Sequence, residues 1–178
     1  MDGKYFEGTA YWQPEEFANG KAVDSVFSED EWPFKLVNCK AKLRSVSMLS
    51  NAPVLTDLSP KNFIEVNTLD AQALGLKTGD QVKLISATGG SLTGKLLVRK
   101  GIARGTAAVG FGYGHWAYGA QGYQIGSRKY EGDKSREGGI MAGQVSPLDT
   151  FFEKVFGLSD VSVGIPARNG GRYKIVRI

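Results

Sequence analysis

Ile64-Glu-Val-Asn-Thr-Leu-Asp-Ala-Gln-Ala-Leu-Gly-Leu-Lys-Thr-Gly-Asp-Gln-Val-Lys-Leu84 predicts a strand, a short helix, a tight turn and a second strand. The first strand, Phe63–Val66, contains enough apolar residues to be buried. Asn67 is a typical N-cap for the helix over 69–74, and Asp70 follows three residues later. Gly75 is expected to end that helix, because glycine readily adopts the left-handed conformation found after many helices. The second strand, Gln81–Ser86, alternates in polarity as a half-buried strand does.

Further strands are expected on both sides of this segment. Their patterns cover 34–38, 92–100, 106–109 and 172–178, and Gly89-Gly90 predicts a hairpin turn. A short helix is expected over 148–156, whereas 51–60 and 119–139 are predicted to be loops. Many short strands, few helices and no internal repeat favour a mainly β, compact barrel over a doubly wound α/β fold. We expect the barrel to occupy residues 32–178, preceded by an extended acidic arm over residues 1–31.

Composition limits the class of protein and of site. The chain has 178 residues, 24 of them glycine, which suits one turn-rich domain. No apolar run approaches the length that spans a bilayer, and no signal peptide is visible. Cys39 is the only cysteine, so an internal disulfide and an iron–sulfur cluster held by this chain alone are excluded. We expect Cys39 to be a small core residue.

Charge is distributed unevenly along the chain. Residues 1–31 carry eight Asp or Glu against two Lys or Arg, and residues 93–136 carry eight Lys or Arg against two Asp or Glu. The basic region predicts an anionic partner, with an ordinary solvated face as the alternative. The basic residues are scattered and form no dense patch, which argues against nucleic acid as the partner.

The basic region contains the unusual stretch Phe111-Gly-Tyr-Gly-His-Trp-Ala-Tyr-Gly-Ala120. It holds the only histidine, His115, beside Trp116, one of three tryptophans. Glycines allow close approach of the backbone, and aromatic rings supply flat surfaces with polar tips. The stretch therefore predicts a loop that packs against a flat polar group, although Trp116 alone would also fit a plug for the barrel end.

The 64–84 segment resembles the C-terminal dinucleotide-binding domain of molybdopterin oxidoreductases. That family shows Asn or His, then Asp-Ala, Leu-Gly-Ile and Gly-Asp-x-Val at this spacing. The resemblance covers about residues 34–178 and implies a six-stranded double-psi β-barrel. Gly112–Ala120 is similar to the Gly-His-Trp-Ala-x-Gly-Ala segment of the catalytic subunits of tetrathionate and respiratory arsenate reductases. Trp12-Gln-Pro14 and Asp160-Val-Ser-Val-Gly164 are similar to the same group.

The resemblance implies a cofactor, molybdopterin guanine dinucleotide carrying molybdenum or tungsten and shared with other domains. It implies that His115 donates to a pterin or phosphate oxygen, that Trp116 packs on the cofactor, and that Asp70 accepts hydrogen bonds from guanine. We expect the segments that hold these residues to meet at one mouth of the barrel. The candidate cofactor-binding residues are Lys40, Arg44, Ser45, Ser47, Asn67, Asp70, Gly114, His115, Trp116, Asp160 and Arg172.

Structural interpretations of these residues stay open. Lys40–Ser47 also fits exposed basic residues beside a strand end, and Asn67 with Asp70 also fits a helix cap. The family usually has Gly-Ile-Asn-x-Asn where this chain has Gly139-Ile-Met-Ala-Gly143, so Met141 and Gly143 replace two expected cofactor contacts.

The resemblance implies a cofactor-binding domain of an oxidoreductase that acts on a sulfur or arsenic oxyanion, inactive alone and with no catalytic or metal-binding residue of its own. Its implied partners are the guanine nucleotide moiety, the other domains of the same catalytic polypeptide and, through them, iron–sulfur and membrane-anchor subunits, with no direct membrane contact. The implied location is the outer face of the cytoplasmic membrane, with the cytoplasm as the alternative. A double-psi-barrel module that binds a protein partner is the alternative function. A self-processing decarboxylase-type barrel is disfavoured, because neither Gly90-Ser91 nor Gly126-Ser127 provides a convincing cleavage site.

Overall fold

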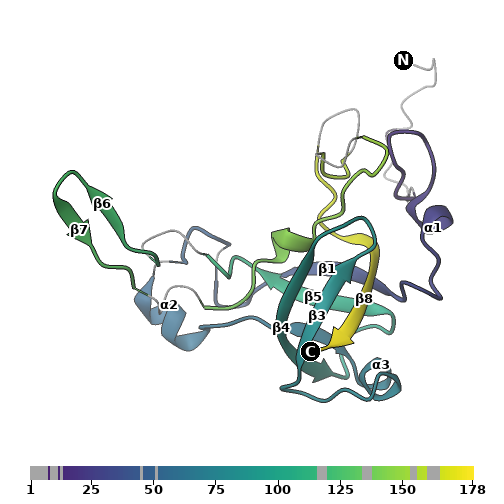
Figure 1. Cartoon of the computed structure of the whole chain (residues 1–178). Helices are drawn as coiled ribbons and strands as arrows, with labels where there is room; N and C mark the ends of the chain where they lie inside the picture. The colour runs from purple at the N-terminus through teal and green to yellow at the C-terminus, as the bar shows by residue number, and fades with distance from the viewer. Residues whose placement is uncertain are drawn as a thin grey trace.

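The fold comes from a computed structural model of the chain (Figure 1). The structure describes residues 8, 12, 14–44, 46–50, 52–115, 120–133, 138–152, 156–159 and 165–178. Three of the predicted site residues, Ser45, Trp116 and Asp160, lie outside the described residues.

Six strands close into a barrel in the order β1-β5-β2-β4-β3-β8, which confirms the predicted fold class. The pairs β1–β5 and β2–β4 are parallel, and the other neighbouring pairs are antiparallel. The barrel strands are β1 Phe34–Lys40, β2 Ile64–Asn67, β3 Gln81–Ser86, β4 Ser91–Arg99, β5 Thr106–Phe111 and β8 Gly170–Arg177.

The barrel interior is filled by one side chain in two along each strand, because successive side chains point to opposite faces. The largest of them is Tyr173, which is fully buried and donates its hydroxyl hydrogen to the Val145 carbonyl at 2.8 Å. Val145 belongs to the 3₁₀ helix η2, Ala142–Val145, which packs on the same core. Each fully buried aliphatic side chain contributes about 1.5–3 kcal/mol. The other large interior side chains are Leu36, Ile64, Leu84, Leu96, Val66, Val82 and Val109.

Strand direction separates the predicted site segments between the two ends of the barrel. In the parallel pair β1–β5, Lys40 is opposite Phe111, so the loops after both strands begin at the same end. Strand β2 runs antiparallel to β5, with Ile64 opposite Val109. Asn67, the last residue of β2, therefore lies at the other end. The expectation that all three segments meet at one mouth was wrong.

The predicted helix is present as α3, Thr68–Ala73, with Asn67 as its N-cap. The Asn67 side chain accepts a hydrogen bond from Leu69 N at 2.8 Å, and Gly75 follows the helix with φ +64°. Asp70 takes no part in the cap and instead accepts from Gly105 N at 2.8 Å. The predicted role of Asn67 in the cap is therefore confirmed, and the predicted role of Asp70 in it was wrong.

Two elements form where loops were expected. Helix α2, Pro53–Leu58, begins at a proline, which suits a first helical turn because proline has no N–H to leave unpaired. A hairpin of β6, Tyr123–Ile125, and β7, Arg128–Tyr130, projects away from the barrel on the side of α2 (Figure 1). The rings of Tyr123 and Tyr130 stack across it, with centroids 4.8 Å apart.

The helix expected over 148–156 is contradicted. Leu148 forms an antiparallel bridge with Gly157, and Asp149 N donates to Phe156 O at 3.0 Å. A helix of this length would hold its two ends roughly 12 Å apart, at 1.5 Å per residue. The chain therefore reverses direction between Leu148 and Gly157 and cannot form the expected helix.

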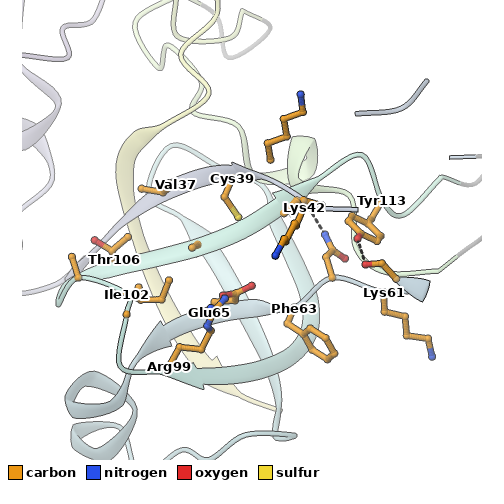
Figure 2. Close-up of a pocket in the computed structure, with 18 residues that line it drawn as sticks. Val37, Cys39, Lys42, Lys61, Phe63, Glu65, Arg99, Ile102, Thr106 and Tyr113 are labelled. Carbon is orange, nitrogen blue, oxygen red and sulfur yellow. Dashed lines mark hydrogen bonds and ion pairs between the residues drawn. The ribbon is translucent and has the colours of Figure 1, made fainter. Parts of the chain in front are cut away.

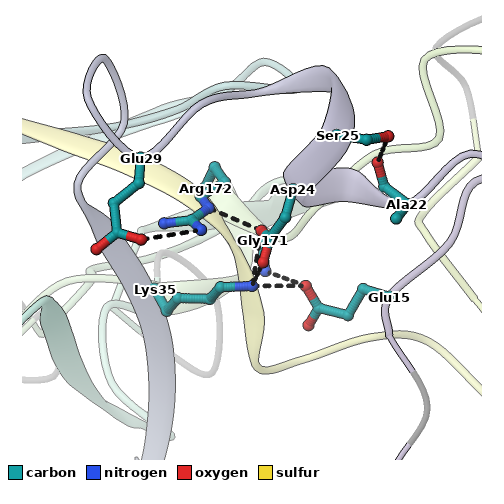
Figure 3. Close-up of polar contacts among 8 residues, drawn as sticks. All are labelled: Glu15, Ala22, Asp24, Ser25, Glu29, Lys35, Gly171 and Arg172. Carbon is teal, nitrogen blue, oxygen red and sulfur yellow. Dashed lines mark hydrogen bonds and ion pairs between the residues drawn. The ribbon is translucent and has the colours of Figure 1, made fainter.

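Residues 14–31 lie against the barrel and contain the short helix α1, Val23–Val26. Phe17 and Val23 pack with Leu158 in a second small core. Charged contacts join the same segment to the strands: Asp24 binds Lys35 at 2.9 Å and Arg172 at 2.7 Å (Figure 3). Among the described residues, no helix combines the length and apolar character needed to cross a membrane.

Candidate cofactor site at the end of the barrel

A hollow of about 390 Å³ lies where the chain leaves β5 and meets the segment that leads into η2. We call it the barrel-end hollow. It brings the histidine loop together with the Gly139–Gly143 segment, the two stretches whose family counterparts are expected to contact the pterin. Its lining residues are Thr93, Gly114, His115, Gln121, Gly139, Ile140, Met141 and Gln144.

Gly114 allows these two segments to touch. Its φ is +70°, and a Cβ at this position would lie 2.3 Å from Met141 N and 2.5 Å from the carbonyl carbon of Ile140. Its own N–H donates to the Gly138 carbonyl at 3.1 Å. Only glycine combines this backbone conformation with this approach, so the residue fixes where His115 enters the hollow.

Asn62 holds the opposite segment. Its Nδ2 donates to the carbonyls of Gly110 at 2.6 Å and Ile140 at 2.9 Å, while its Oδ1 accepts from Ile140 N at 2.6 Å. One side chain therefore ties the end of β5 to the segment that lines the hollow.

Arg44 is buried, with 4% of its surface exposed. Its guanidinium donates to the carbonyls of Ser59 at 3.2 Å and Gly112 at 3.4 Å and lies 4.2 Å from the centroid of the Tyr113 ring. The Tyr113 hydroxyl in turn lies 2.6 Å from Ser59 Oγ. These contacts make Arg44 a positioning residue for the histidine loop, since little of its surface is available to a ligand.

A second and larger hollow, of about 680 Å³, lies on the outer face of β1, β5 and β2 (Figure 2). We call it the barrel-face basin. Its floor includes Cys39, Thr106, Ala108 and Gly110, and Lys40, Lys42, Lys61, Phe63, Glu65, Arg99 and Tyr113 also line it. Glu65 and Arg99 form an ion pair of 2.7 Å.

Cys39 belongs to this basin and not to the core, so the expectation of a core residue was wrong. Burial, and then the neighbouring Glu65 carboxylate, raise the pKa of its thiol above the ordinary value. The neutral thiol is neither a strong nucleophile nor a good metal ligand. The described part of the chain contains no group of three or more His, Cys, Asp or Glu that could hold a metal ion.

The predicted site residues fall into three places. Lys40, Arg44, Ser47, Gly114 and His115 lie on the segments at the Lys40 end of the barrel. The Ser47 carbonyl accepts from the hydroxyl of Ser50 at 2.7 Å, which makes a local turn.

Asn67 and Asp70 lie at the other end, where both hold the loop between β4 and β5. Asn67 Nδ2 donates to the Ile102 carbonyl at 2.6 Å, and Asp70 also lies 3.5 Å from Arg104 Nε. Arg172 lies apart from both groups, on β8, where its side chain is 8% exposed and pairs with Asp24 and Glu29 (Figure 3).

Sequence reasoning missed several residues that form the two hollows. Asn62 and Tyr113 act through contacts with distant segments, which no local pattern reveals. The sequence contained one weak indication that Phe63 and Glu65 lie together, because residues at alternate positions of a predicted strand share one face. Gln121 and Gln144 lie in segments whose conformation the sequence did not predict.

The side chains of the barrel-end hollow fit a flat, polar ring system. Thr93 offers a hydroxyl, His115 an imidazole, and Gln121 and Gln144 offer amides with both donors and acceptors. A pterin presents several ring nitrogens, an amino group and a carbonyl along its edge, so this donor and acceptor set is suitable for it. The arrangement is suited to binding and orienting a ligand.

Comparison with known proteins agrees with a site that is suited to a pterin. The family model described as "Molydopterin dinucleotide binding domain" matches residues 34–135. One of the subunits of tetrathionate reductase from Salmonella typhimurium is 29% identical over 175 residues, which cover 94% of this chain and 17% of that protein. One of the subunits of the selenate reductase of Mesobacillus selenatarsenatis is 30% identical over 162 residues, covering 84% of this chain and 15% of that protein.

The molybdopterin-containing subunit of the arsenate respiratory reductase of a Shewanella species is 35% identical over 99 residues, covering 51% of this chain and 12% of that protein. The chain thus spans less than a fifth of the length of these relatives. Among solved structures, acetylene hydratase from Pelobacter acetylenicus shares the fold, with a TM-score of 0.62, 19% identity, and coverage of 95% of this chain and 21% of that chain. Because the family model matches more than half of the residues, the chain belongs to the family of molybdopterin dinucleotide-binding domains.

Proposed function

We propose that this domain binds and orients the guanine dinucleotide part of a molybdopterin cofactor within an oxidoreductase that acts on a sulfur or arsenic oxyanion. The observation that carries the proposal is the junction at the barrel end, where Gly114 and His115 meet the Gly139–Gly143 segment in one polar hollow. The metal of such a cofactor, when bound, supplies the electron-transfer chemistry, and the protein supplies binding and orientation.

In this proposal His115 donates a hydrogen bond to a pterin or phosphate oxygen, and Gln121, Gln144 and Thr93 hold the pterin edge. Lys40, exposed at the same end of the barrel, provides charge for a phosphate. Arg44 and Asn62 act through the backbone segments that they hold. Met141 lines the hollow where the family usually has asparagine, so its side chain offers apolar contact instead of an amide.

The oxyanion class rests on the relatives, whose names specify reductases of tetrathionate, arsenate and selenate. The proposed partners are the other domains of the same catalytic polypeptide, which share the cofactor, and through them iron–sulfur and membrane-anchor subunits. Either molybdenum or tungsten is compatible with the proposal, because the metal ligands belong to those other domains.

The test is titration of the chain under anaerobic conditions with molybdopterin guanine dinucleotide released from a purified molybdoenzyme, followed by tryptophan fluorescence. We expect saturable binding that His115→Ala weakens about tenfold, as loss of one charge-assisted or well-oriented hydrogen bond would. Lys77→Ala, which removes one lysine at the other end of the barrel, is the control and should leave the affinity unchanged. An unchanged affinity of His115→Ala would show that this role of His115 is wrong.

A protein-binding module is the second candidate function, and the projecting hairpin is the observation that favours it. Tyr123 and Ile125 of β6 are 54% and 65% exposed. If the chain failed to bind the cofactor but formed a complex that Ile125→Asp abolished, this second function would replace the first.

A further inference from the structure

We propose that one face of the β6–β7 hairpin is a docking surface for another domain of the oxidoreductase, and that a carboxylate of that domain pairs with Arg128. We call this face the ribbon face; it consists of Tyr123, Ile125, Arg128 and Tyr130. This docking rests on the proposed function and, unlike the second candidate function, it accompanies cofactor binding.

The ribbon face is mainly apolar. Residues that are opposite each other in an antiparallel pair share one face, and so do residues two positions apart on one strand. Tyr123 is opposite Tyr130, and Ile125 is opposite Arg128, so all four side chains lie on the same side. The apolar three remain accessible, at 54% for Tyr123, 65% for Ile125 and 38% for Tyr130.

The other face of the hairpin is polar, and its groups find partners within the hairpin. Gln124 Nε2 donates to the Gly126 carbonyl at 2.8 Å. Lys129 Nζ lies 3.4 Å from the carboxylate of Glu131. The hairpin is therefore amphipathic, with one face suited to water and one face that lacks a covering layer.

A two-stranded ribbon of this kind has no core of its own. An isolated hairpin is marginally stable in water unless a further layer packs on its apolar face. The stacked tyrosines supply about 0.5–1.5 kcal/mol beyond their buried area, which is a small contribution. The hairpin projects away from the barrel (Figure 1), so the missing layer comes from outside the described part of this domain.

The base of the hairpin is closely packed. A Cβ on Gly132 would lie 2.4 Å from the Ala120 carbonyl oxygen and 2.5 Å from Gly122 N, so only glycine allows the two strands to leave the domain this close together. Ala120 itself is buried. Gln121, the residue between Ala120 and Gly122, lines the barrel-end hollow. A partner held by the ribbon face would thus also help to hold one wall of the proposed pterin site.

Charge identifies the chemistry of the partner. Arg128 is exposed and forms no ion pair with any other residue that the structure describes. Covering the ribbon face with a purely apolar surface would bury this guanidinium without a partner, which is costly. A second copy of the chain offers no carboxylate on its own ribbon face, and two such faces in contact would bring two guanidinium groups together. The charge therefore favours a different protein surface that is apolar and carries an Asp or Glu.

The area of the ribbon face favours a partner from the same assembly. Its three apolar side chains expose on the order of 300 Å², if a whole tyrosine buries about 150–250 Å². A stable interface between freely diffusing proteins needs about 800 Å² on each side. Linked domains meet at an effective concentration of about millimolar, so a smaller contact is sufficient for them. In the relatives, more than four fifths of the polypeptide lies outside the part that this chain matches.

The experiment is site-specific photo-cross-linking in the assembled oxidoreductase. Ile125 of the complete chain is replaced by p-benzoyl-phenylalanine in the organism that encodes it, the purified assembly is irradiated, and the cross-linked peptide is identified by mass spectrometry. We expect a cross-link to an apolar segment of the molybdopterin-containing oxidoreductase, outside the barrel, with an Asp or Glu beside it.

Two charge reversals on opposite faces provide the matched comparison. Arg128→Glu should reduce the yield of the cross-link about tenfold, because it places a carboxylate against a carboxylate. Lys129→Glu makes the same change of charge on the polar face and should leave the yield unchanged. Replacing the identified Asp or Glu with lysine should restore the cross-link in Arg128→Glu. Proton NMR contacts between the rings of Tyr123 and Tyr130 in the chain alone report whether the hairpin forms in each variant.

Several outcomes would overturn the docking surface. A cross-link to the barrel of the same chain, to a second copy, to lipid or to a protein outside the oxidoreductase would assign the ribbon face to a different occupant. Equal yields from Arg128→Glu and Lys129→Glu, with the hairpin formed in both, would show that no carboxylate pairs with Arg128.

Cofactor titration of the chain alone separates this docking from the proposed function. Arg128→Glu should bind the cofactor as the wild type does, because Arg128 lies outside the barrel-end hollow. Absence of the cross-link, with cofactor still bound in a His115-dependent manner, would overturn the docking and leave the proposed function standing. Loss of cofactor binding in the wild-type chain, with the cross-link to the oxidoreductase still dependent on Arg128, would overturn the proposed function alone.

Discussion

Asn62 binds both backbone groups of Ile140, accepting its N–H at 2.6 Å and donating to its carbonyl at 2.9 Å. The two residues are separated by 78 positions in the chain. A third bond joins the same amide to the Gly110 carbonyl at 2.6 Å. This side chain therefore fixes the segment over the barrel end to the strand that leads into the histidine loop, and both walls of the barrel-end hollow depend on it.

Replacing Asn62 with alanine should destabilise the domain by about 2–3 kcal/mol, because three part-buried hydrogen bonds are lost at roughly 1 kcal/mol each. Urea unfolding measures the loss, and hydrogen exchange should show a faster Ile140 amide. Asn19→Ala is the control, since its side chain accepts from Lys21 N in an exposed turn. Equal stability of the two variants would contradict the role of Asn62.

Gly114→Ala should cost about 2–3 kcal/mol and shift the amide signals of His115 and Met141. The left-handed backbone is strained for alanine, and the new Cβ would lie 2.3 Å from Met141 N. Gly126→Ala is a matched control, because Gly126 also has positive φ, +59°, but no atom lies within 4 Å of its Cβ position. It should cost only about 1 kcal/mol. Similar losses in thermal or urea unfolding would show that close packing at Gly114 is unimportant.

Asp24→Asn should lower stability at pH 7 by about 1 kcal/mol, a modest value because the carboxylate is half exposed. Burial alone would raise the pKa of Asp24, but hydrogen bonds from Lys35 and Arg172 and the charges of these residues lower it overall. A carboxyl group with a lowered folded-state pKa stabilises the fold above its unfolded pKa, about 3.9, and this stability is lost as the pH falls through the folded value.

Urea unfolding of the wild type and Asp24→Asn between pH 3 and 7 tests this contact. The difference in stability should be greatest near neutrality and shrink toward pH 3. Glu31→Gln, an exposed change in the same segment, is the control and should change stability by less than about 0.5 kcal/mol. A difference that is independent of pH would contradict the charged contact.

Asp70→Ala should release the loop between β4 and β5 and cost about 1.5–3 kcal/mol, the range for a hydrogen bond to a charged group. The Asp70 carboxylate accepts from Gly105 N at 2.8 Å and is 11% exposed. Hydrogen exchange of the Gly105 amide should become faster, while Asp57→Ala on the exposed surface of α2 leaves it unchanged. An unchanged Gly105 amide in Asp70→Ala would mean that the loop is held by other contacts.

Much of the barrel could be predicted because its strands carry local signals. The 64–84 segment has an apolar strand, a capping asparagine and a helix-ending glycine in sequence, and each forms as expected. The hairpin of β6 and β7 could not be predicted in this way, since every residue in both strands is exposed and the polarity pattern carries no information on burial. The helix expected over 148–156 failed because a bridge between Leu148 and Gly157 overrides local propensity.

The sequence predicted parts of the candidate site only where the residue types have a recognisable chemical function or match a family motif. His115 and the 139–143 segment were singled out by composition and resemblance, and the structure places them in one hollow. Arg44 was also singled out, but its burial against Tyr113 depends on tertiary contacts that the sequence does not reveal. Asn67 was assigned to the wrong end of the barrel, because parallel and antiparallel pairing cannot be read from a single strand.

The most direct test of the central claim is amide NMR mapping of the intact chain with molybdopterin guanine dinucleotide under anaerobic conditions. We predict saturable changes at 112–115 and 138–144 that define the barrel-end hollow. The absence of saturable changes at the barrel end, or changes confined to the β6–β7 hairpin, would contradict the proposed function.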